Sequence, residues 1–554
     1  MKLKRIALTA LVLILVLLCG CSGFSLDQLG SFFSGDEEAQ APVSSEPAPE
    51  ESSEEESMAA EAVMNQAEAP DVLRLAYQEE YGLDPFTTVS LTNRTILSLI
   101  YEPLYVITND FQAEPVLASK TEVSDDGLIT TISLCNGVRF HGGQYLRAQD
   151  VVYSYEKAKA SDYYGNRFYH IDSVTAKNSM TVEVVCSTSM ENVALLLDFP
   201  IVRSGSCGPV ETEEDEEADT QEEELSQTEA DYRPDGTGPF VYDGSYELTR
   251  FADWWQEDWF LGYQTASLTP CSTAADIRDH YEYGLVNLVC TDPSSAAYAA
   301  YHNDFELWSA PTTIMQYVGF NHNDKVFGHD EVRACITYVI DREAIVAEDL
   351  GGFGLPATLP ASPLSPSYNP GLAADYALDL DAFYALLDEA KIADYSGEDG
   401  ILEVYGKDYA RALSGTMIVN AASNQRVATA NRIADALNAV GFDITVEPLE
   451  ETEYQNALRY QNYDLYYGEI RMSNNFDMGS FFRDYGSASF GGSASASGVN
   501  LCYDMLENSG NAYDLHKWVM DKGMVIPVLF KSYAVYTTRG AAQNLSPAVD
   551  WVIH

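Results

Sequence analysis

The chain contains few basic residues for its length. Of its 554 residues, 31 are Lys or Arg and 85 are Asp or Glu, which gives a formal net charge of -54. A protein that binds nucleic acid needs clustered Lys and Arg side chains to neutralise the phosphates. This composition therefore argues against DNA or RNA as a partner.

Sequence motifs of common enzymes are also absent. The sequence has no HExxH, no GxSxG and no phosphate-binding GxxxxGK[ST], and its eight His residues show no metal-binding spacing. Glycoside hydrolysis requires only two suitably placed acids, so a secreted hydrolase stays open as an unfavoured alternative, although no pair stands out. We expect no enzymatic activity, no bound metal and no cofactor.

The nine Cys residues form no CxxC pair, which argues against a zinc site. After Cys21 they are odd in number and scattered, so the sequence allows one or two disulfides without assigning them. Their positions are Cys135, Cys186, Cys207, Cys271, Cys290, Cys335 and Cys502. Cys335 falls on the apolar face of an expected helix, where we expect it in the core.

The longest apolar run lies at the start of the chain and is too short to span a bilayer comfortably. It covers the thirteen residues Ile6–Leu18, against about 20 for a membrane span. Basic residues precede it, as in a signal peptide, which we place at 1–20. The ending Leu18-Cys19-Gly20-Cys21 resembles the bacterial lipobox, which implies lipidation of Cys21; an uncleaved signal anchor is the alternative. Two acyl chains suffice for stable membrane attachment.

Much of the negative charge lies in two runs, 36–56 and 211–231. The second run holds twelve acids and no base. Such runs repel themselves and stay solvated. We therefore expect 21–70, which is rich in Ser, Glu, Ala and Pro, to be a disordered tether, and 211–231 to be a disordered insertion.

Between these segments, the hydrophobic pattern switches between the periods of strands and helices. Alternating residues predict strands, and residues three to four apart predict helices. Asp341 is placed to cap a helix that ends at Gly351-Gly352, and Gly441 separates a helix from the strand that follows it. The pattern predicts strands at 72–76, 128–134, 181–185 and 442–446, and helices at 95–104, from 148, at 330–340 and at 433–440. This is the arrangement of an α/β protein.

The ordered segments contain a series of short motifs that resemble, in their order, those of one family. These are Ile100–Tyr105 (YEPL), Glu122–Gly127, Gly137–Gly143, Ala148–Val152, Gly236–Phe240 (GTGP), Val318–Asn321, Glu331–Arg333 and Ile340–Arg342. The resemblance is to the extracellular solute-binding proteins of family 5, which serve oligopeptide, dipeptide and nickel ABC importers. It spans about 71 to 551, apart from the acidic insertion at 211–231.

This resemblance implies a two-lobed α/β fold of the periplasmic-binding-protein type (type II, cluster C), with an extra subdomain inserted in the first lobe. Ligand would lie in the cleft between lobes that close by a hinge motion. The implied division is 71–107, 233–310 and 521–554 for the first lobe, 108–232 for the subdomain and 311–520 for the second lobe.

The resemblance also implies the function. We expect a lipid-anchored, monomeric substrate-binding subunit on the extracytoplasmic face of a bacterial membrane, periplasmic if an outer membrane is present. It would bind a peptide-like solute and deliver it to an ABC permease. The alternatives are a receptor of the same fold for a metal chelate, sugar or opine, and a sensor that presents its ligand to another partner.

Candidate ligand-binding residues follow from the same resemblance. In peptide-binding members, an Asp pairs with the peptide amine, and backbone groups just before it hold the peptide chain. That Asp falls here on Asn474, which can form a hydrogen bond with an amine but cannot neutralise it, and Ser473 becomes a backbone contact. Either the nearby Asp477 takes over the amine, or the ligand lacks a free amine. Arg471 is a candidate for a ligand carboxylate and Trp255 for an apolar contact. The alternatives are a helix cap for Asp477, a structural ion pair for Arg471 and core packing for Trp255.

Overall fold

The computed structural model describes most of the chain after the tether. The described residues are 72–207, 233–256, 262–298, 300–302, 305–392, 400–406, 409–542, 547, 549, 551 and 553. The signal peptide, Cys21, the tether and the insertion at 211–231 lie outside them. None of the helices in the described part is both long and apolar enough to cross a membrane.

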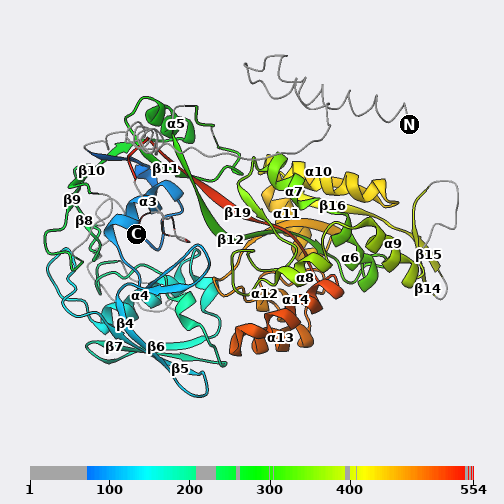
Figure 1. The fold of residues 1–554 in the computed structure, drawn as a ribbon, viewed down its shortest axis with the longest axis horizontal. Coiled ribbons are helices and arrows are strands. Elements are labelled where there is room, and N and C mark those ends of the chain that lie inside the picture. The colour runs from blue at the N-terminus through cyan, green and yellow to red at the C-terminus, as the bar shows by residue number, and fades with distance from the viewer. Residues whose placement is uncertain are drawn as a thin grey trace, which may run out of the picture. The chain divides into compact units, whose positions relative to one another are not determined.

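An eleven-stranded mixed sheet organises the fold. Its continuous path is β17 (Asp443–Leu449), β16 (Ser414–Asn420), β18 (Leu465–Arg471), β12 (Glu306–Phe320), β19 (Ile526–Thr537), β11 (Leu288–Thr291), β1 (Leu73–Tyr77), β10 (Thr265–Pro270), β9 (Glu247–Arg250) and β8 (Phe240–Tyr242). The remaining strand, β13 (Gly354–Pro356), pairs with β19. Figure 1 shows β12 and β19 as the long adjacent strands at the centre of this path.

Two large hydrophobic cores include opposite ends of these long strands. One consists mainly of residues between 315 and 530, and the other mainly of residues between 73 and 290. Strand β19 contributes to both, because Phe530 belongs to the first core and Val535 to the second. The chain therefore passes from one core to the other within a single strand.

A separate four-stranded antiparallel sheet contributes its buried side chains to the second core. Its order is β4 (Ala118–Val123), β5 (Ile129–Leu134), β7 (Thr181–Cys186) and β6 (Ile171–Asn178), and α4 (Ala148–Ala160) packs against it. Asp150 closes the first turn of α4 by accepting a hydrogen bond from the Arg147 amide at 2.8 Å. The loop after α4, 161–170, leads to the candidate site.

The predicted elements are largely confirmed, with two corrections. The predicted strands correspond to β1, β5, β7 and β17, and the helix before Gly441 is α10 (Asn424–Ala439). The helix expected at 95–104 is α3 (Leu91–Ile100): it begins earlier because the Ser90 hydroxyl caps the Asn93 amide at 3.1 Å. It also ends earlier, since Pro103 favours an extended residue before it.

The helix expected at 330–340 is α-helical only over α6 (Asp330–Cys335) and continues as a 3₁₀ turn over Ile336–Val339. Asp341 caps the next helix through the Ala344 amide at 3.0 Å, as predicted. Cys335 is fully buried, and the seven Cys residues that the structure describes are all free thiols.

Candidate functional site

The carboxyl ends of three parallel strands define the candidate site. Strand β16 runs parallel to both β17 and β18, so these strands end at the same edge of the sheet. In open α/β sheets, ligands bind beyond this edge. Asn420 at the end of β16, Glu451 just after β17 and Arg471 at the end of β18 all line one cavity of about 680 Å³. This volume suits a small-molecule ligand.

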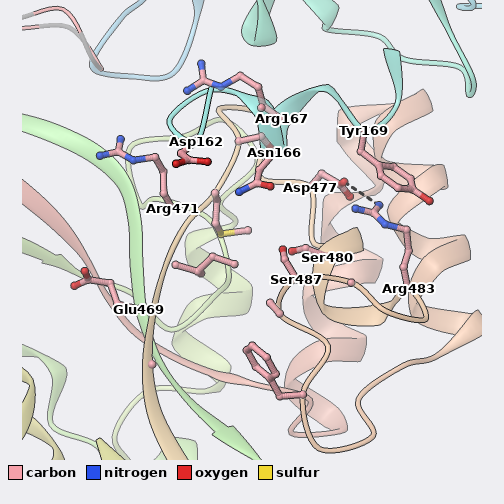
Figure 2. Close-up of a pocket in the computed structure, with 18 of the residues that line it drawn as sticks. Asp162, Asn166, Arg167, Tyr169, Glu469, Arg471, Asp477, Ser480, Arg483 and Ser487 are labelled. Atoms are coloured by element: carbon pink, nitrogen blue, oxygen red, sulfur yellow. Dashed lines mark hydrogen bonds and ion pairs between the residues drawn. The ribbon is translucent and has the colours of Figure 1, made fainter. Parts of the chain in front are cut away.

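The cavity has two facing walls, shown in Figure 2. The 162–170 wall is the loop after α4, and the 469–490 wall runs from the end of β18 through α12 (Gly479–Phe482). Charged side chains of both signs line the cavity: Asp162, Glu451, Glu469, Asp477, Asp484, Arg167, Arg426, Arg471 and Arg483. The two walls come from segments about 300 residues apart in sequence.

A buried aromatic cluster fixes the 469–490 wall. Phe476 has a positive φ of 56°, a conformation that is costly for a residue with a bulky side chain. Its ring is fully buried and packs against Phe111 and Phe530, with centroids 4.9 and 5.6 Å apart. This packing holds the strained backbone in place, so the neighbouring residues are positioned before any ligand arrives.

Asp477 lines the cavity and also accepts a hydrogen bond at the start of α12, whose N-cap residue is Met478. Its Oδ1 accepts a hydrogen bond from the Gly479 amide at 2.9 Å, at the start of α12. Its Oδ2 lies 3.4 Å from His170 Nε2 and 3.5 Å from Arg483 Nη1. Burial raises the pKa of Asp477, but the hydrogen bond and charge of His170 and the charge of Arg483 outweigh it and hold the pKa below its usual value. This carboxylate is thus ionised and already partnered.

Asn474 lies on the opposite side of the 469–490 wall. Its side chain is 1% exposed and does not line the cavity. The amide nitrogen donates to the Leu195 carbonyl at 2.9 Å and to Asp198 Oδ2 at 3.0 Å. Asp198 also forms a buried ion pair with Arg167. Asn474 therefore ties the wall to the subdomain, and the geometry gives no support to its predicted contact with a ligand amine.

Ser473 and Arg471 do line the cavity. The Ser473 hydroxyl donates to Asn475 Oδ1 at 2.7 Å. The Arg471 guanidinium donates to the Tyr533 hydroxyl at 3.0 Å and lies over the Tyr163 ring, 4.5 Å from its centroid. Arg471 thus spans from β18 to the 162–170 wall.

The structure places Trp255 away from the cavity. Its indole nitrogen lies 3.0 and 3.2 Å from the two carboxyl oxygens of Glu102, and its ring packs against the second core. Thr237, Trp254 and Gln256 also donate to this carboxyl group. Burial raises the pKa of Glu102 to about 7, against the opposing effect of these hydrogen bonds. These contacts fit the core packing that was the alternative for Trp255.

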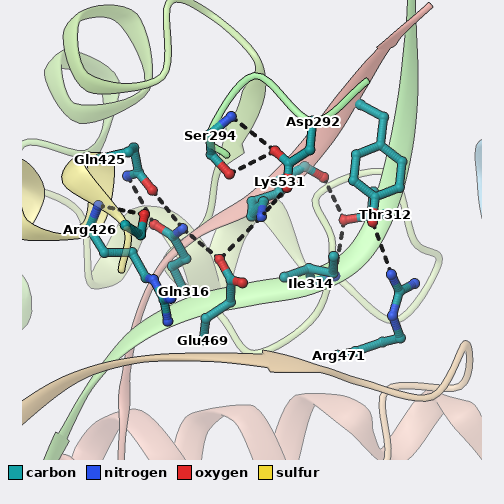
Figure 3. Close-up of polar contacts among 12 residues, drawn as sticks. Asp292, Ser294, Thr312, Ile314, Gln316, Gln425, Arg426, Glu469, Arg471 and Lys531 are labelled. Carbon is teal, nitrogen blue, oxygen red and sulfur yellow. Dashed lines mark hydrogen bonds and ion pairs between the residues drawn. The ribbon is translucent and has the colours of Figure 1, made fainter. Parts of the chain in front are cut away.

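Sequence reasoning missed several cavity residues, among them Glu469 and Arg426. Figure 3 shows Glu469 in a polar network with Gln316 and Lys531. Glu469 Oε2 accepts from Gln316 Nε2 at 2.8 Å and lies 3.3 Å from Lys531 Nζ, which also pairs with Asp292 at 2.7 Å. Arg426, in the first turn of α10, forms no ion pair with any described residue. The rule that ligands bind beyond the carboxyl ends of parallel strands could have pointed to both.

Among the residues that the structure describes, no group of three or more His, Cys, Asp or Glu side chains is arranged to hold a metal ion.

A second cavity of about 520 Å³ lies on the Asn474 side of the 469–490 wall, between that wall and strands β4 and β5. The two cavities share Met190 and Asn475 in their linings.

Comparison with known proteins is consistent with these features. Residues 112–492 match the family described as bacterial extracellular solute-binding proteins, family 5 Middle. The oligopeptide-binding protein AppA of Bacillus subtilis is 25% identical over 391 residues, covering 67% of this chain and 67% of AppA. The glutathione-binding protein GsiB of Salmonella typhimurium is 25% identical over 315 residues, covering 54% of this chain and 59% of GsiB. The alignment with GsiB thus spans less than two thirds of that relative.

Solved structures show the same fold. The ABC transporter substrate-binding protein CtaP of Listeria monocytogenes superposes with a TM-score of 0.66 at 17% identity, covering 88% of this chain and 98% of CtaP. The structure of AppA in complex with a nonapeptide gives a TM-score of 0.56 at 20% identity, covering 85% and 94%. The fold is therefore the predicted α/β fold of the periplasmic-binding-protein type.

Proposed function

This chain belongs to family 5 of the bacterial extracellular solute-binding proteins, and from that premise we propose that it binds a peptide-like solute and delivers it to an ABC permease. The observation that carries the proposal is the cavity of about 680 Å³ at the carboxyl ends of β16, β17 and β18. The proteins it resembles bind oligopeptides and glutathione, which are both peptide-like.

The cavity lining suits a ligand with charges of both signs and a polar backbone. Arg426 and Arg471 offer guanidinium groups, which bind carboxylates in a two-pronged geometry. Ser473, Ser480 and Asn475 offer hydrogen bonds to a peptide main chain. Tyr169 and Tyr485 are 61% and 104% exposed and supply aromatic surface that can adapt to varied side chains.

The two facing walls suit a binding site that closes around its ligand. The contact of Asp477 Oδ2 with His170 Nε2 at 3.4 Å and the hydrogen bonds of Asn474 to Leu195 and Asp198 join the subdomain to the 469–490 wall. A ligand that contacts both walls would favour this closed arrangement over an open one. Closure of this kind can present the loaded protein to a permease.

The proposal includes attachment of the protein to the extracytoplasmic face of a membrane through Cys21. The support comes from the sequence, which places Cys21 after an apolar run preceded by basic residues. The 49 residues between Cys21 and Asp71 would hold the folded body away from the membrane while keeping it near its permease. The protein acts as a monomer with no enzymatic step.

A thermal-shift screen of the detergent-solubilised full chain tests the proposal. The ligand classes are free-amine peptides, N-acetylated peptides, amino acids, sugars and metal chelates. A ligand at about 100 times its dissociation constant adds about 2.7 kcal/mol of stability. We expect a saturable shift with peptides; a shift only with sugars or metal chelates would refute the peptide class while leaving solute binding intact.

A further inference from the structure

The cavity offers five carboxylates, and their surroundings differ. The five are Asp162, Glu451, Glu469, Asp477 and Asp484. Three of them, Asp162, Glu451 and Asp484, are exposed, so water and salt weaken any ion pair they form. A ligand ammonium taken out of water requires a carboxylate that is itself shielded. Only Glu469 and Asp477 meet that condition among the cavity-lining acids that the structure describes.

Asp477 is already neutralised by the protein. Arg483 and His170 contact the same oxygen, at 3.5 and 3.4 Å, and the Gly479 amide contacts the other. The Arg483 guanidinium also stacks on the Tyr169 ring, with its central carbon 3.7 Å from the ring centroid. A ligand ammonium at Asp477 would have to displace or approach this fixed cation.

Glu469, unlike Asp477, is not fully neutralised by the protein. Its side chain is 23% exposed, and its Oε2 receives the contacts from Gln316 and Lys531. Its Oε1 accepts no hydrogen bond from any residue in the described part of the chain. Lys531 lies closer to Asp292, at 2.7 Å, than to Glu469, at 3.3 Å. The three charges Asp292, Lys531 and Glu469 therefore sum to minus one, with a spare acceptor on the residue that lines the cavity.

The carboxylate of Glu469 is also held in place before a ligand binds. Gln316 is fully buried, and its side-chain oxygen accepts from the Tyr467 hydroxyl at 2.8 Å. Its amide nitrogen donates to both Glu469 and Gln425, at 2.8 and 2.9 Å. Because these bonds fix Gln316, the carboxylate that it contacts loses little freedom on binding.

We propose that Glu469 pairs with the protonated amine of the ligand and makes the protein selective for solutes with a free amino group. The contact with the ligand amine, which the family resemblance suggested for Asn474, is thus assigned to Glu469 on β18. It rests on the proposed function, because it concerns the ligand in the same cavity. A charge-assisted hydrogen bond of this kind predicts a preference for free-amine over N-acetylated peptides of about 10- to 100-fold.

The test is a competition experiment with the full chain in detergent. An equimolar library of tri- to hexapeptides with free amines is mixed with the same library after N-acetylation, and mass spectrometry measures the ratio of the two forms that stay bound. A ratio is independent of the fraction of protein that is folded. The wild type should retain free-amine peptides about 10- to 100-fold better.

Three variants assign this preference to a residue. Glu469→Gln keeps the shape but removes the charge and should bring the ratio close to one, whereas Glu469→Asp should restore most of the preference. Glu453→Gln removes one charge from an exposed position outside the cavity lining and should leave the ratio unchanged.

The outcomes separate the two proposals. If Glu469→Gln keeps the wild-type ratio, the role of Glu469 is refuted. Equal retention of both libraries by the wild type refutes the amine preference but supports peptide binding. Retention of neither library refutes the proposed function itself.

Discussion

Replacing Asn474 by Asp separates the structural role of this position from a ligand-binding role. The Asn474 amide donates two hydrogen bonds, to Leu195 and to Asp198, in a place where it is 1% exposed and Asp198 is fully buried. In the Asn474→Asp variant, an ionised carboxylate would lose both donors and face the Asp198 carboxylate at about hydrogen-bond distance. Such a like-charge pair raises the pKa of one member.

Protonation limits the cost of this substitution. Protonating an Asp whose unfolded pKa is about 3.9 costs about 4 kcal/mol at pH 7 and about 1.5 kcal/mol at pH 5. The protonated carboxyl group of the variant can donate to Asp198 but not to Leu195 as well, which leaves one buried acceptor unsatisfied at a cost of about 1 kcal/mol. We therefore expect a loss of up to about 5 kcal/mol in the free energy of unfolding at pH 7.

The stability of the Asn474→Asp variant should depend on pH in one direction. Because the folded-state pKa of the introduced carboxyl group lies above its unfolded value, the folded variant binds the extra proton and loses stability as pH rises. The gap between variant and wild type should narrow by up to about 3 kcal/mol from pH 7 to pH 5.

Urea unfolding of the full chain at both pH values measures this gap. Asn431→Asp makes the same chemical change at an exposed position of α10 and should cost little at either pH. Equal stability of Asn474→Asp and wild type at pH 7 would contradict the reasoning, as would a gap that does not narrow on acidification. A gain in affinity for free-amine peptides would instead support the role inferred from the family resemblance.

Three further predictions concern other parts of the chain. Cys21→Ser should move the protein from the membrane fraction to the soluble fraction of cells; a variant that stays in the membrane would refute lipid anchoring at Cys21. Deletion of 211–231, a run with twelve acids and almost no apolar residues, should change the melting temperature little, and a large drop would refute its assignment as an insertion. Since the folded-state pKa of Glu102 is about 7 and its ordinary value is 4.5, folding stability should fall by about 3 kcal/mol as pH rises from 4.5 to 7. In urea unfolding at several pH values, Glu102→Gln should reduce this fall of stability with pH. An unchanged pH dependence in the variant would mean that other groups cause it.

Local features of the fold followed from the sequence where local chemistry decides them. The Asp341 cap is set by residues adjacent in sequence, and Gly441 adopts a φ of 104° that an L-residue rarely takes. The start of α3 was missed because the cap at Ser90 lies before the apolar pattern begins.

The candidate site was harder to predict because distant residues orient its side chains. Asn474 turns away from the cavity to meet Asp198, 276 residues earlier, and Trp255 meets Glu102, 153 residues earlier. Glu469 gains its spare negative charge only because Lys531 lies nearer to Asp292. No spacing within the sequence encodes these contacts, whereas the order of parallel strands does indicate the edge where they meet.

The most direct test of the central claim is a crystal structure of the protein with the peptide that gives the largest thermal shift. We expect the peptide between the 162–170 and 469–490 walls, in contact with Ser473 and Arg471 and with its amine on Glu469. A peptide bound outside this cavity, such as in the second cavity beside β4 and β5, would contradict the account.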